Sequence, residues 1–310
     1  IGSIDGYNSA KKKLSKEKKI FNFEKTDEYI YFVDNKVIKF FQNKEIIKRR
    51  CLRAKKLNGL CPAIESETKF FYSYKKIDGI TIYSSKKSII VKTLLQWLKK
   101  NLWKKEYLDD QKIGSFRDAC RLFYYEKTIN RLNTYYDKYN LRNLDRSING
   151  EPVETVSNLI SKIDWKWLCK GIPTKFHGDL QFDNILLTNN DNFVLLDWRQ
   201  DFSGILEYGD MYYDLAKLNG GIYVSYQKIK KNLFTYEENL DDIKIFVQSD
   251  LFLKKSKQIF NNFVKKNNLD IRKIEVLTGI IFLNMAAMHH APFSHFIYHL
   301  GRYKLHKWIN

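Results

Sequence analysis

One stretch limits the fold more than any other part of the 310-residue chain. It reads, from Phe176 to Trp198, FHGDLQFDNILLTNNDNFVLLDW. Two short apolar segments flank a polar turn, which is the pattern of two strands joined as a β-hairpin. Asp179 and Asn184 precede the first strand, and Asp197 follows the second. We therefore predict that the hairpin brings Asp179, Asn184 and Asp197 together at one end.

These three residue types suit phosphoryl transfer to a hydroxyl. Such transfer uses a carboxylate near the acceptor hydroxyl, together with oxygen ligands that hold Mg²⁺ on the phosphates. An amide oxygen and one carboxylate are sufficient protein ligands, because Mg²⁺ keeps several of its waters. The spacing predicts Asp179 as the catalytic carboxylate, with Asn184 and Asp197 as metal ligands.

The same residues resemble the motifs of the choline kinase and aminoglycoside phosphotransferase family, the small-molecule branch of the kinase-like fold. The matching motifs are His177-Gly178-Asp179-Leu180, Asn184-Ile185-Leu186, Leu195-Leu196-Asp197-Trp198, Gly209-Asp210 and Tyr213-Asp214-Leu215-Ala216. The resemblance implies an α+β fold of two lobes, a small antiparallel-sheet N-lobe and a mostly helical C-lobe. It also implies ATP and Mg²⁺ as cofactors and a small-molecule hydroxyl as acceptor. His177 would serve the catalytic loop by bracing it rather than by ionising.

The small lobe is expected at residues 20–77. Segments 20–23, 29–33 and 36–41 alternate like three strands, and the loop between the first two would cover the ATP phosphates. That loop has no glycine, so Thr26 and its neighbours would approach the phosphates instead. Protein kinases carry glycines at this place.

Two further small-lobe residues are assigned to the nucleotide by the resemblance. Lys39 resembles the strand lysine that contacts the α- and β-phosphates; otherwise a lysine between apolar neighbours would face solvent. Tyr74 lies on a later strand, just before the expected lobe boundary near residues 75–80. The helix at 44–57 offers no clear glutamate partner for Lys39, because Glu45 comes early and positions 48–56 hold Arg and Lys but no Glu.

The large lobe is expected at residues 78–310, with the catalytic hairpin at 174–198. Helical periodicity predicts helices at 89–103, 115–139, 156–163, 251–265 and 271–288, and a polar connection at 143–155. Ser115 is the expected N-cap of the second helix. Asp210 has two open roles, as a helix cap or as a tie for the catalytic loop. The histidines after position 288 would form a wall of the acceptor pocket.

The acceptor is less constrained than the reaction. Trp198, Arg199, Glu207 and Tyr212 are the candidate acceptor residues. Arg199 favours anion or sugar-hydroxyl contacts, whereas a choline-type cation would need a carboxylate and aromatic faces. We expect a sugar or sugar-like precursor of a surface polysaccharide, with choline or another amino alcohol next and an aminoglycoside third. An inactive kinase-like scaffold is the remaining alternative within this fold.

The ends and the composition add weaker expectations. Residues 1–19 resemble the closing segment of sugar nucleotidylyltransferases, which implies a linked upstream domain. The 54 Lys and Arg against 35 Asp and Glu give a net charge of +19, but lysines are spread along the chain and no nucleic-acid reader motif is present. We therefore do not expect nucleic acid as a partner. Four dispersed cysteines and the lack of an 18-residue apolar run predict a cytoplasmic protein without a membrane span.

Overall fold

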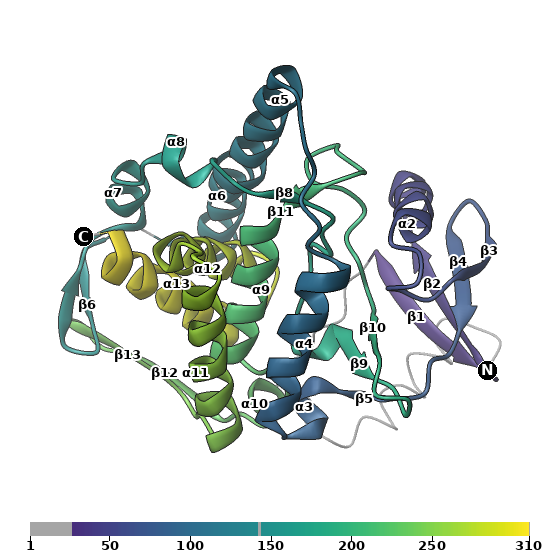
Figure 1. Cartoon of the computed structure of the whole chain (residues 1–310). Helices are drawn as coiled ribbons and strands as arrows, with labels where there is room; N and C mark the ends of the chain where they lie inside the picture. Colours follow the sequence, from purple (N-terminus) through teal and green to yellow (C-terminus); the bar gives the residue numbers. More distant parts are fainter. Residues whose placement is uncertain (1–26, 142–143, 310) are drawn as a thin grey trace.

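A computed structural model describes residues 27–141 and 144–309. Within this range the chain forms a small sheet-based lobe beside a larger helical lobe, as Figure 1 shows. This is the α+β, two-lobed arrangement predicted from the motifs. The expected strand at 20–23, the phosphate-loop residue Thr26 and the segment 1–19 lie outside the described residues.

The small lobe contains a four-stranded antiparallel sheet. Its strands are β1 (Glu28–Val33), β2 (Lys36–Phe41), β3 (Ile64–Glu67) and β4 (Phe71–Lys75), in the order β1-β2-β4-β3. The β1–β2 turn is tight because Asp34 adopts a left-handed conformation, with φ at 50°. Side chains alternate along a strand, and in β2 Val37, Lys39 and Phe41 are the buried set. Lys39 therefore points inward, which removes the solvent-facing alternative.

One helix packs against this sheet. Helix α2 (Lys44–Lys56) begins where the Asn43 side chain accepts a hydrogen bond from the Glu45 N–H, and its last turn is basic. Its boundaries agree with the expected helix. Ile47 and Cys51 fill the space against the sheet, while a row of basic side chains on α2 reaches the large lobe.

The large lobe is built from helices around a buried spine. The helices are α3 (Ile82–Ser85), α4 (Ser88–Asn101), α5 (Asp110–Arg121), α6 (Lys127–Tyr139), α7 (Val156–Ser161), α8 (Trp165–Leu168), α9 (Met211–Tyr223), α10 (Tyr226–Lys230), α11 (Leu251–Lys266), α12 (Ile271–Ala286) and α13 (Phe293–Ile309). Nearly every residue of α12 is buried, as its all-round apolar sequence predicts. Helices α12 and α13 cross closely, because a Cβ at Gly301 would lie only 2.9 Å from the Gly279 carbonyl oxygen.

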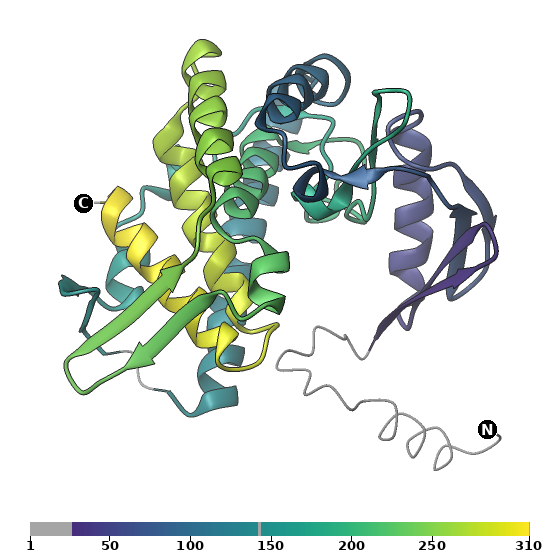
Figure 2. The same cartoon turned by 90° about the horizontal axis from the view of Figure 1, so that it is seen from below.

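The catalytic hairpin lies between the two lobes (Figure 1, Figure 2). Strands β9 (Ile185–Leu187) and β10 (Phe193–Leu195) form it, and β5 (Ile80–Thr81) pairs with the outer edge of β9. A further two-stranded pair joins β8 (Pro173–Thr174) to β11 (Gly209–Asp210). The hairpin was predicted from the sequence and is confirmed.

A second four-stranded sheet, at the far end of the large lobe, was not expected. It has the order β12-β13-β6-β7, with strands β6 (Arg146–Ile148), β7 (Glu151–Val153), β12 (Phe234–Glu238) and β13 (Asp242–Val247). The segment 143–155 is thus partly a hairpin rather than only a polar connection. Its turn is Asn149-Gly150, both with positive φ, which is a strong hairpin signal.

The expected helix 115–139 also differs in detail. The helix begins at Asp110, where the Asp109 carboxylate accepts a hydrogen bond from the Lys112 N–H. Ser115 lies inside the helix and its hydroxyl donates to the Gln111 carbonyl, so it is not the N-cap. A π-turn at Leu122–Glu126 then separates α5 from α6. None of the described helices is long and apolar enough to cross a membrane.

Candidate active site

The hairpin holds the three predicted oxygen-bearing side chains at one end. Asn184 ends a short 3₁₀ turn before β9, and its carbonyl accepts a hydrogen bond from Leu196 N–H, at 2.7 Å, just before Asp197. The Asn184 amide donates to the Asp179 carbonyl oxygen at 2.9 Å and to the Asp179 carboxylate at 3.1 Å. All three residues line the same cavity. Their convergence confirms the geometry predicted from the hairpin.

Asp197 binds two basic side chains at this end of the hairpin. Its Oδ1 accepts from Lys39 Nζ and from Arg50 Nη1, each at 2.6 Å. Burial alone would raise the pKa of this carboxyl, but the two cations hold the pKa well below its usual range. Asp197 also has a positive φ of 57°, a backbone strain that is common at functional sites. The site therefore presents an ionised carboxylate throughout the physiological pH range.

Arg50 is a residue that the sequence analysis missed. It projects from α2, where a glutamate partner for Lys39 was sought, and it binds the carboxylate itself instead. Its guanidinium lies 4.6 Å from the Phe41 ring centroid, and its carbonyl accepts from Trp198 Nε1 at 2.8 Å. The absence of Glu and the presence of Arg in this helix were visible in the sequence, but the partner of Arg50 is 147 positions away.

Lys217 is a second residue found only in the structure. It lies on α9, is 8% exposed, and its Nζ is 2.6 Å from Asp179 Oδ1. Burial opposes the charge on Lys217, yet Asp179 raises its pKa overall. In turn Lys217 outweighs the burial of Asp179 and lowers the pKa of that carboxyl. Asp179 is thus an ionised carboxylate whose basicity is reduced by a neighbouring ammonium group.

Asp214 fixes the loop that carries Asp179. Its buried carboxylate accepts from the His177 N–H and the Gly178 N–H, both at 2.8 Å, and from Trp103 Nε1 at 3.3 Å. Gly178 has a φ of 87°, and a Cβ there would lie 2.6 Å from Arg199 Cβ, so only glycine fits this tight turn. The loop conformation depends on both residues.

His177 completes the brace from inside the loop. It is fully buried and its Nδ1 accepts the Asp179 N–H at 3.2 Å. Burial lowers the pKa of His177 to about 4, so the imidazole is neutral near pH 7. This side chain can therefore act as a structural brace, but not as a proton carrier near pH 7.

Asp210 is a helix cap and not the tie for the catalytic loop. Its Oδ1 accepts the Tyr212 N–H at 3.0 Å and the Ile172 N–H at 2.9 Å, and its Oδ2 accepts from the Tyr124 hydroxyl at 2.8 Å. The role of tying down the loop, which the sequence left open for Asp210, belongs to Asp214, one helical turn later. The Tyr-Asp-Leu-Ala motif contained this residue, but its spacing alone did not distinguish the two carboxylates.

Two oxygens of the site remain available for a magnesium ion. In the described part of the chain, no hydrogen bond or ion pair engages Asn184 Oδ1 or Asp197 Oδ2. The opposite atoms of both side chains are held, which fixes their orientation. Hard oxygen ligands of this kind suit Mg²⁺, so the residues fit the metal that the motif implies.

The cavity that contains these residues has a volume of about 930 Å³. It extends from Asp27, Glu28 and Ile46 in the small lobe, past the acidic trio, to His289 and His290 after α12. Arg199 lines it, as expected for an acceptor residue. The histidine segment does so too, through these two residues.

Other predicted site residues do not line the cavity. Trp198 is fully buried and packs 6.0 Å from the Tyr72 ring, because its indole binds α2. Glu207 is exposed and pairs with Lys56 at 2.9 Å. The Tyr212 hydroxyl accepts from the Asp270 N–H on the far side of α9. Tyr74 is buried in the small-lobe sheet beside Tyr72.

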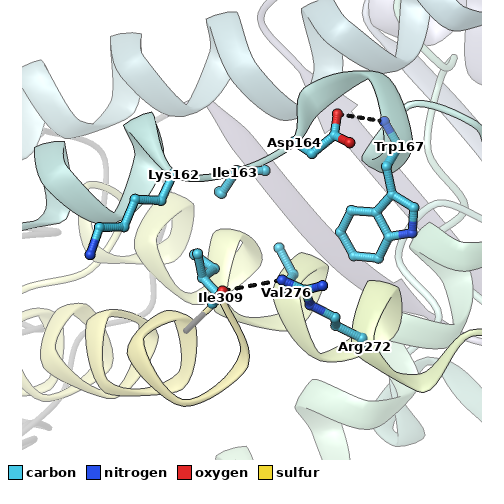
Figure 3. A pocket seen from close by; sticks show the side chains of 7 residues that line it. All are labelled: Lys162, Ile163, Asp164, Trp167, Arg272, Val276 and Ile309. Carbon is cyan, nitrogen blue, oxygen red and sulfur yellow. Dashed lines mark hydrogen bonds between the residues drawn. The ribbon is translucent and has the colours of Figure 1, made fainter.

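A smaller hollow of about 220 Å³ lies at the other end of the large lobe (Figure 3). It is lined by Lys162, Ile163, Asp164, Trp167, Arg272, Val276 and Ile309. Its polar groups are already bonded to one another: Asp164 accepts the Trp167 N–H, and Arg272 donates to the carbonyls of Trp308 and Ile309. This hollow carries none of the chemistry found in the large cavity.

A search of solved structures finds several that resemble this chain over most of its length. The chain is similar to "putative fructosamine-3-kinase" from Thermobifida fusca, with 12% identity, 92% of each chain covered and a TM-score of 0.54. It is also similar to the gentamicin complex of APH(2")-IIa, with 16% identity, 98% of this chain and 95% of the other covered, and a TM-score of 0.49. For choline kinase LicA from Streptococcus pneumoniae, the identity is 13%, 98% of this chain and 100% of the other are covered, and the TM-score is 0.46.

The Thermobifida fusca superposition shows that the chain has the two-lobed kinase-like fold. At 12% identity it shows the fold alone. No family model matches the sequence, and no curated protein matches it. The predicted fold is therefore confirmed, and the activity has to be argued from the site.

Proposed function

We propose that the protein transfers the γ-phosphoryl group of ATP to a hydroxyl of a small molecule. The observation that carries this proposal is the convergence of Asp179, Asn184 and Asp197 in one cavity between the lobes, with Lys39 bound to Asp197. A carboxylate for the hydroxyl, two oxygen ligands for a metal and a strand lysine for the phosphates are the parts that phosphoryl transfer requires.

The step is a displacement at the γ-phosphorus. A bond forms between the acceptor oxygen and the γ-phosphorus, and the bond from that phosphorus to the β–γ bridging oxygen breaks, which leaves ADP. The hydroxyl proton passes to Asp179 and from there to solvent. Since the transition state of phosphoryl transfer is loose, Asp179 needs only to orient the hydroxyl, and a lowered pKa is acceptable.

Lys39 and Arg50 orient Asp197 and supply positive charge where the phosphates would lie. Magnesium, held by Asn184 Oδ1 and Asp197 Oδ2, would supply charge neutralisation on the β- and γ-phosphates. The short segment between Asp197 and α9 leaves the acceptor side open to a small molecule.

The acceptor that we propose is a sugar or sugar-like alcohol, such as a precursor of surface polysaccharide. Arg199 in the cavity supports this choice, because a guanidinium binds hydroxyl and anionic oxygens and repels a cationic acceptor. Choline, other amino alcohols and aminoglycosides are the alternatives that the acceptor panel compares.

The test is ADP release by the purified full chain from ATP and Mg²⁺, against a panel of sugars, amino alcohols and aminoglycosides. We expect Asp179→Asn to lower kcat by roughly 10²- to 10⁴-fold, as for loss of a positioned base. Asp197→Asn should lower it by at least roughly 10²-fold, because it removes charge stabilisation. Asp191→Asn, the same change at the exposed hairpin turn, is the matched control and should keep full activity.

An inactive scaffold gives a different result. A scaffold would release no ADP with any acceptor, and both active-site variants would bind partners as the wild type does. Activity in Asp179→Asn equal to that of Asp191→Asn would show that Asp179 has been assigned wrongly.

A further inference from the structure

One end of the cavity holds an excess of positive charge that the reaction itself does not need. This acceptor end is formed by Phe123, Lys127, Arg131, Arg199 and Asn284, around the open side of Asp179. The Lys127 ammonium lies 4.2 Å from the Phe123 ring centroid, and the Arg199 guanidinium lies 4.8 Å from the same ring. Two basic side chains thus contact the same aromatic ring.

The three basic side chains form no direct ion pair in the described part of the chain. No ion pair or side-chain hydrogen bond is formed there by Lys127, Arg131 or Arg199, and Arg199 Nε is buried without an acceptor. Burial and then the charges of Arg199, Arg131 and Lys217 lower the pKa of Lys127 well below its usual range, and Asp179 only partly offsets them. Unpaired like charges this close together are costly unless a ligand compensates them.

Three of the carboxylates that line the cavity have other basic neighbours, while Asp27 and Glu28 line it from the small lobe. Asp179 is paired with Lys217, and Asp197 with Lys39 and Arg50. Asp183 lies near Lys230, whose charge opposes the rise in pKa that burial causes in this carboxyl. None of Asp179, Asp183 and Asp197 forms an ion pair with Lys127, Arg131 or Arg199, so an anionic group on a bound molecule would compensate these basic side chains.

A neutral group at the same end points to a hydroxylated ligand. Asn284 Nδ2 donates to Thr128 Oγ1 at 2.7 Å and to the Ile280 carbonyl at 2.9 Å, which fixes the amide. Its Oδ1 is buried and accepts no hydrogen bond from the described residues. Since a buried unsatisfied acceptor is costly, a ligand hydroxyl is the natural donor.

We propose that the acceptor is a hydroxylated compound that already carries an anionic group, a phosphate or a carboxylate. Lys127, Arg131 and Arg199 hold the anion, Asn284 Oδ1 accepts from a second hydroxyl, and the reacting hydroxyl lies at Asp179. This inference rests on the proposed phosphotransferase function and specifies its substrate class. It excludes choline and aminoglycosides, whose cationic groups would meet the basic side chains of Lys127, Arg131 and Arg199.

The first experiment measures binding without turnover. Methyl phosphate, acetate and choline are titrated by calorimetry into the full-length protein saturated with Mg²⁺ and a non-hydrolysable ATP analogue. We expect methyl phosphate or acetate to bind and choline not to bind; whichever anion binds more tightly identifies the anionic group. Preference for choline would overturn the proposal. So would the failure of all probes to bind at concentrations up to about 20 mM, which corresponds to a binding free energy of only about 2 kcal/mol.

Two single variants and one control locate the site. Lys127→Gln and Arg131→Gln should each weaken binding of the preferred anion by roughly tenfold to a hundredfold, as expected for hydrogen bonds to charged groups. Arg117→Gln removes an exposed guanidinium of α5 outside the cavity and should leave binding unchanged. Equal anion binding by all three variants would place the site elsewhere.

Turnover separates this inference from the proposed function. Glucose, glucosamine, glucuronate and glucose 6-phosphate are acceptors that share one carbon skeleton, and the two anionic compounds should be preferred. Arg131→Gln should raise the KM for the anionic acceptors and leave the KM for ATP unchanged. Anion binding without any ATP binding would leave the anion site intact and refute the kinase function. ATP turnover on neutral or cationic acceptors alone, or a loss of ATP affinity in Arg131→Gln, would refute the anionic acceptor and keep the kinase.

Discussion

At the scale of single residues, His177 holds the loop at Asp179 as the motif predicts, and its burial makes this role sensitive to pH. The imidazole is fully buried and neutral, and one ring nitrogen accepts the backbone N–H of Asp179. Protonation would take away this acceptor and leave a charge in the interior. The conformation of the loop at Asp179 therefore depends on His177 remaining unprotonated.

This gives a pH-dependent stability with a definite sign. The pKa of His177 is about 4 in the folded protein, below the usual value of about 6.5 in an unfolded chain. The unfolded state therefore takes up the proton first, and stability is lost as pH falls from about 6.5 towards about 4. Between pH 7 and pH 4.5 the wild type should lose about 2 to 3 kcal/mol more than His177→Asn, which keeps a side-chain acceptor but does not titrate.

Urea unfolding of both proteins at the two pH values measures this difference. Asp214, whose pKa burial raises to about 6, acts in the opposite direction, but it is present in both proteins and cancels. A stability difference between wild type and His177→Asn that is the same at both pH values would contradict the assignment of a buried neutral imidazole.

Asp179, Asn184, Asp197 and Lys39 could be predicted from the sequence because each depends on local spacing or on a strand pattern. Arg50 and Lys217 could not, since each is defined by a contact with a carboxylate far along the chain. Trp198 was misassigned for a related reason. An aromatic side chain beside Asp197 can face the cavity or the core, and only the packing of α2 decides between them.

At the scale of secondary-structure elements, four helices of the large lobe meet around one buried carboxylate. Glu275 on α12 binds Lys257 of α11 at 2.6 Å and Lys304 of α13, and Lys257 also donates to Asn219 of α9 at 2.6 Å. Glu275 is 1% exposed and Lys304 is 7% exposed. The mutual orientation of these helices therefore depends on a single negative charge.

Glu275→Gln should destabilise the fold by about 3–5 kcal/mol, because it leaves buried lysines without a counter-charge at almost unchanged volume. Thermal and urea unfolding measure the loss. The double variant Glu275→Gln with Lys304→Met should recover part of it, since it also removes one of the stranded charges. If the single variant were as stable as the wild type, the cluster would not be an energetic link between α11, α12 and α13.

The elements themselves show where sequence patterns are sufficient. The β9–β10 hairpin, strands β1 and β2 and helix α12 have clear strand patterns or all-round apolarity, and they were predicted closely, as was helix α2. The π-turn at Leu122–Glu126 and the sheet β12-β13-β6-β7 were not. A single π-helical turn of five residues is too short to leave a periodic pattern in the sequence. Strand β6 pairs in parallel with β13, about a hundred residues later.

At the scale of the whole molecule, α2 links the two lobes. Its basic side chains reach the segment that follows the hairpin: Arg49 binds Asp201, Arg50 binds Asp197 and Lys56 binds Glu207. Arg53 is fully buried and donates to the carbonyls of Phe176, Arg199 and Leu206. The helix that begins in the small lobe therefore completes the interior of the large one.

Arg53→Met should lower the unfolding free energy by about 3 kcal/mol or more, because three carbonyls lose their donors in a buried place. Since α2 belongs to both lobes, the wild type should unfold in one cooperative transition whether followed by fluorescence or by far-ultraviolet circular dichroism. Lys48→Met, at an exposed position of the same helix, is the control. Separate transitions for the two lobes in the wild type would show that α2 does not couple them.

The pairing at Asp197 has a consequence for how the site fills. One carboxylate faces two cations, Lys39 and Arg50, so a bare divalent ion arriving alone meets a surplus of its own sign. A polyanionic nucleotide reverses that balance. Metal and nucleotide should accordingly arrive as one charge-compensated unit, and the empty crevice should show little affinity for magnesium by itself.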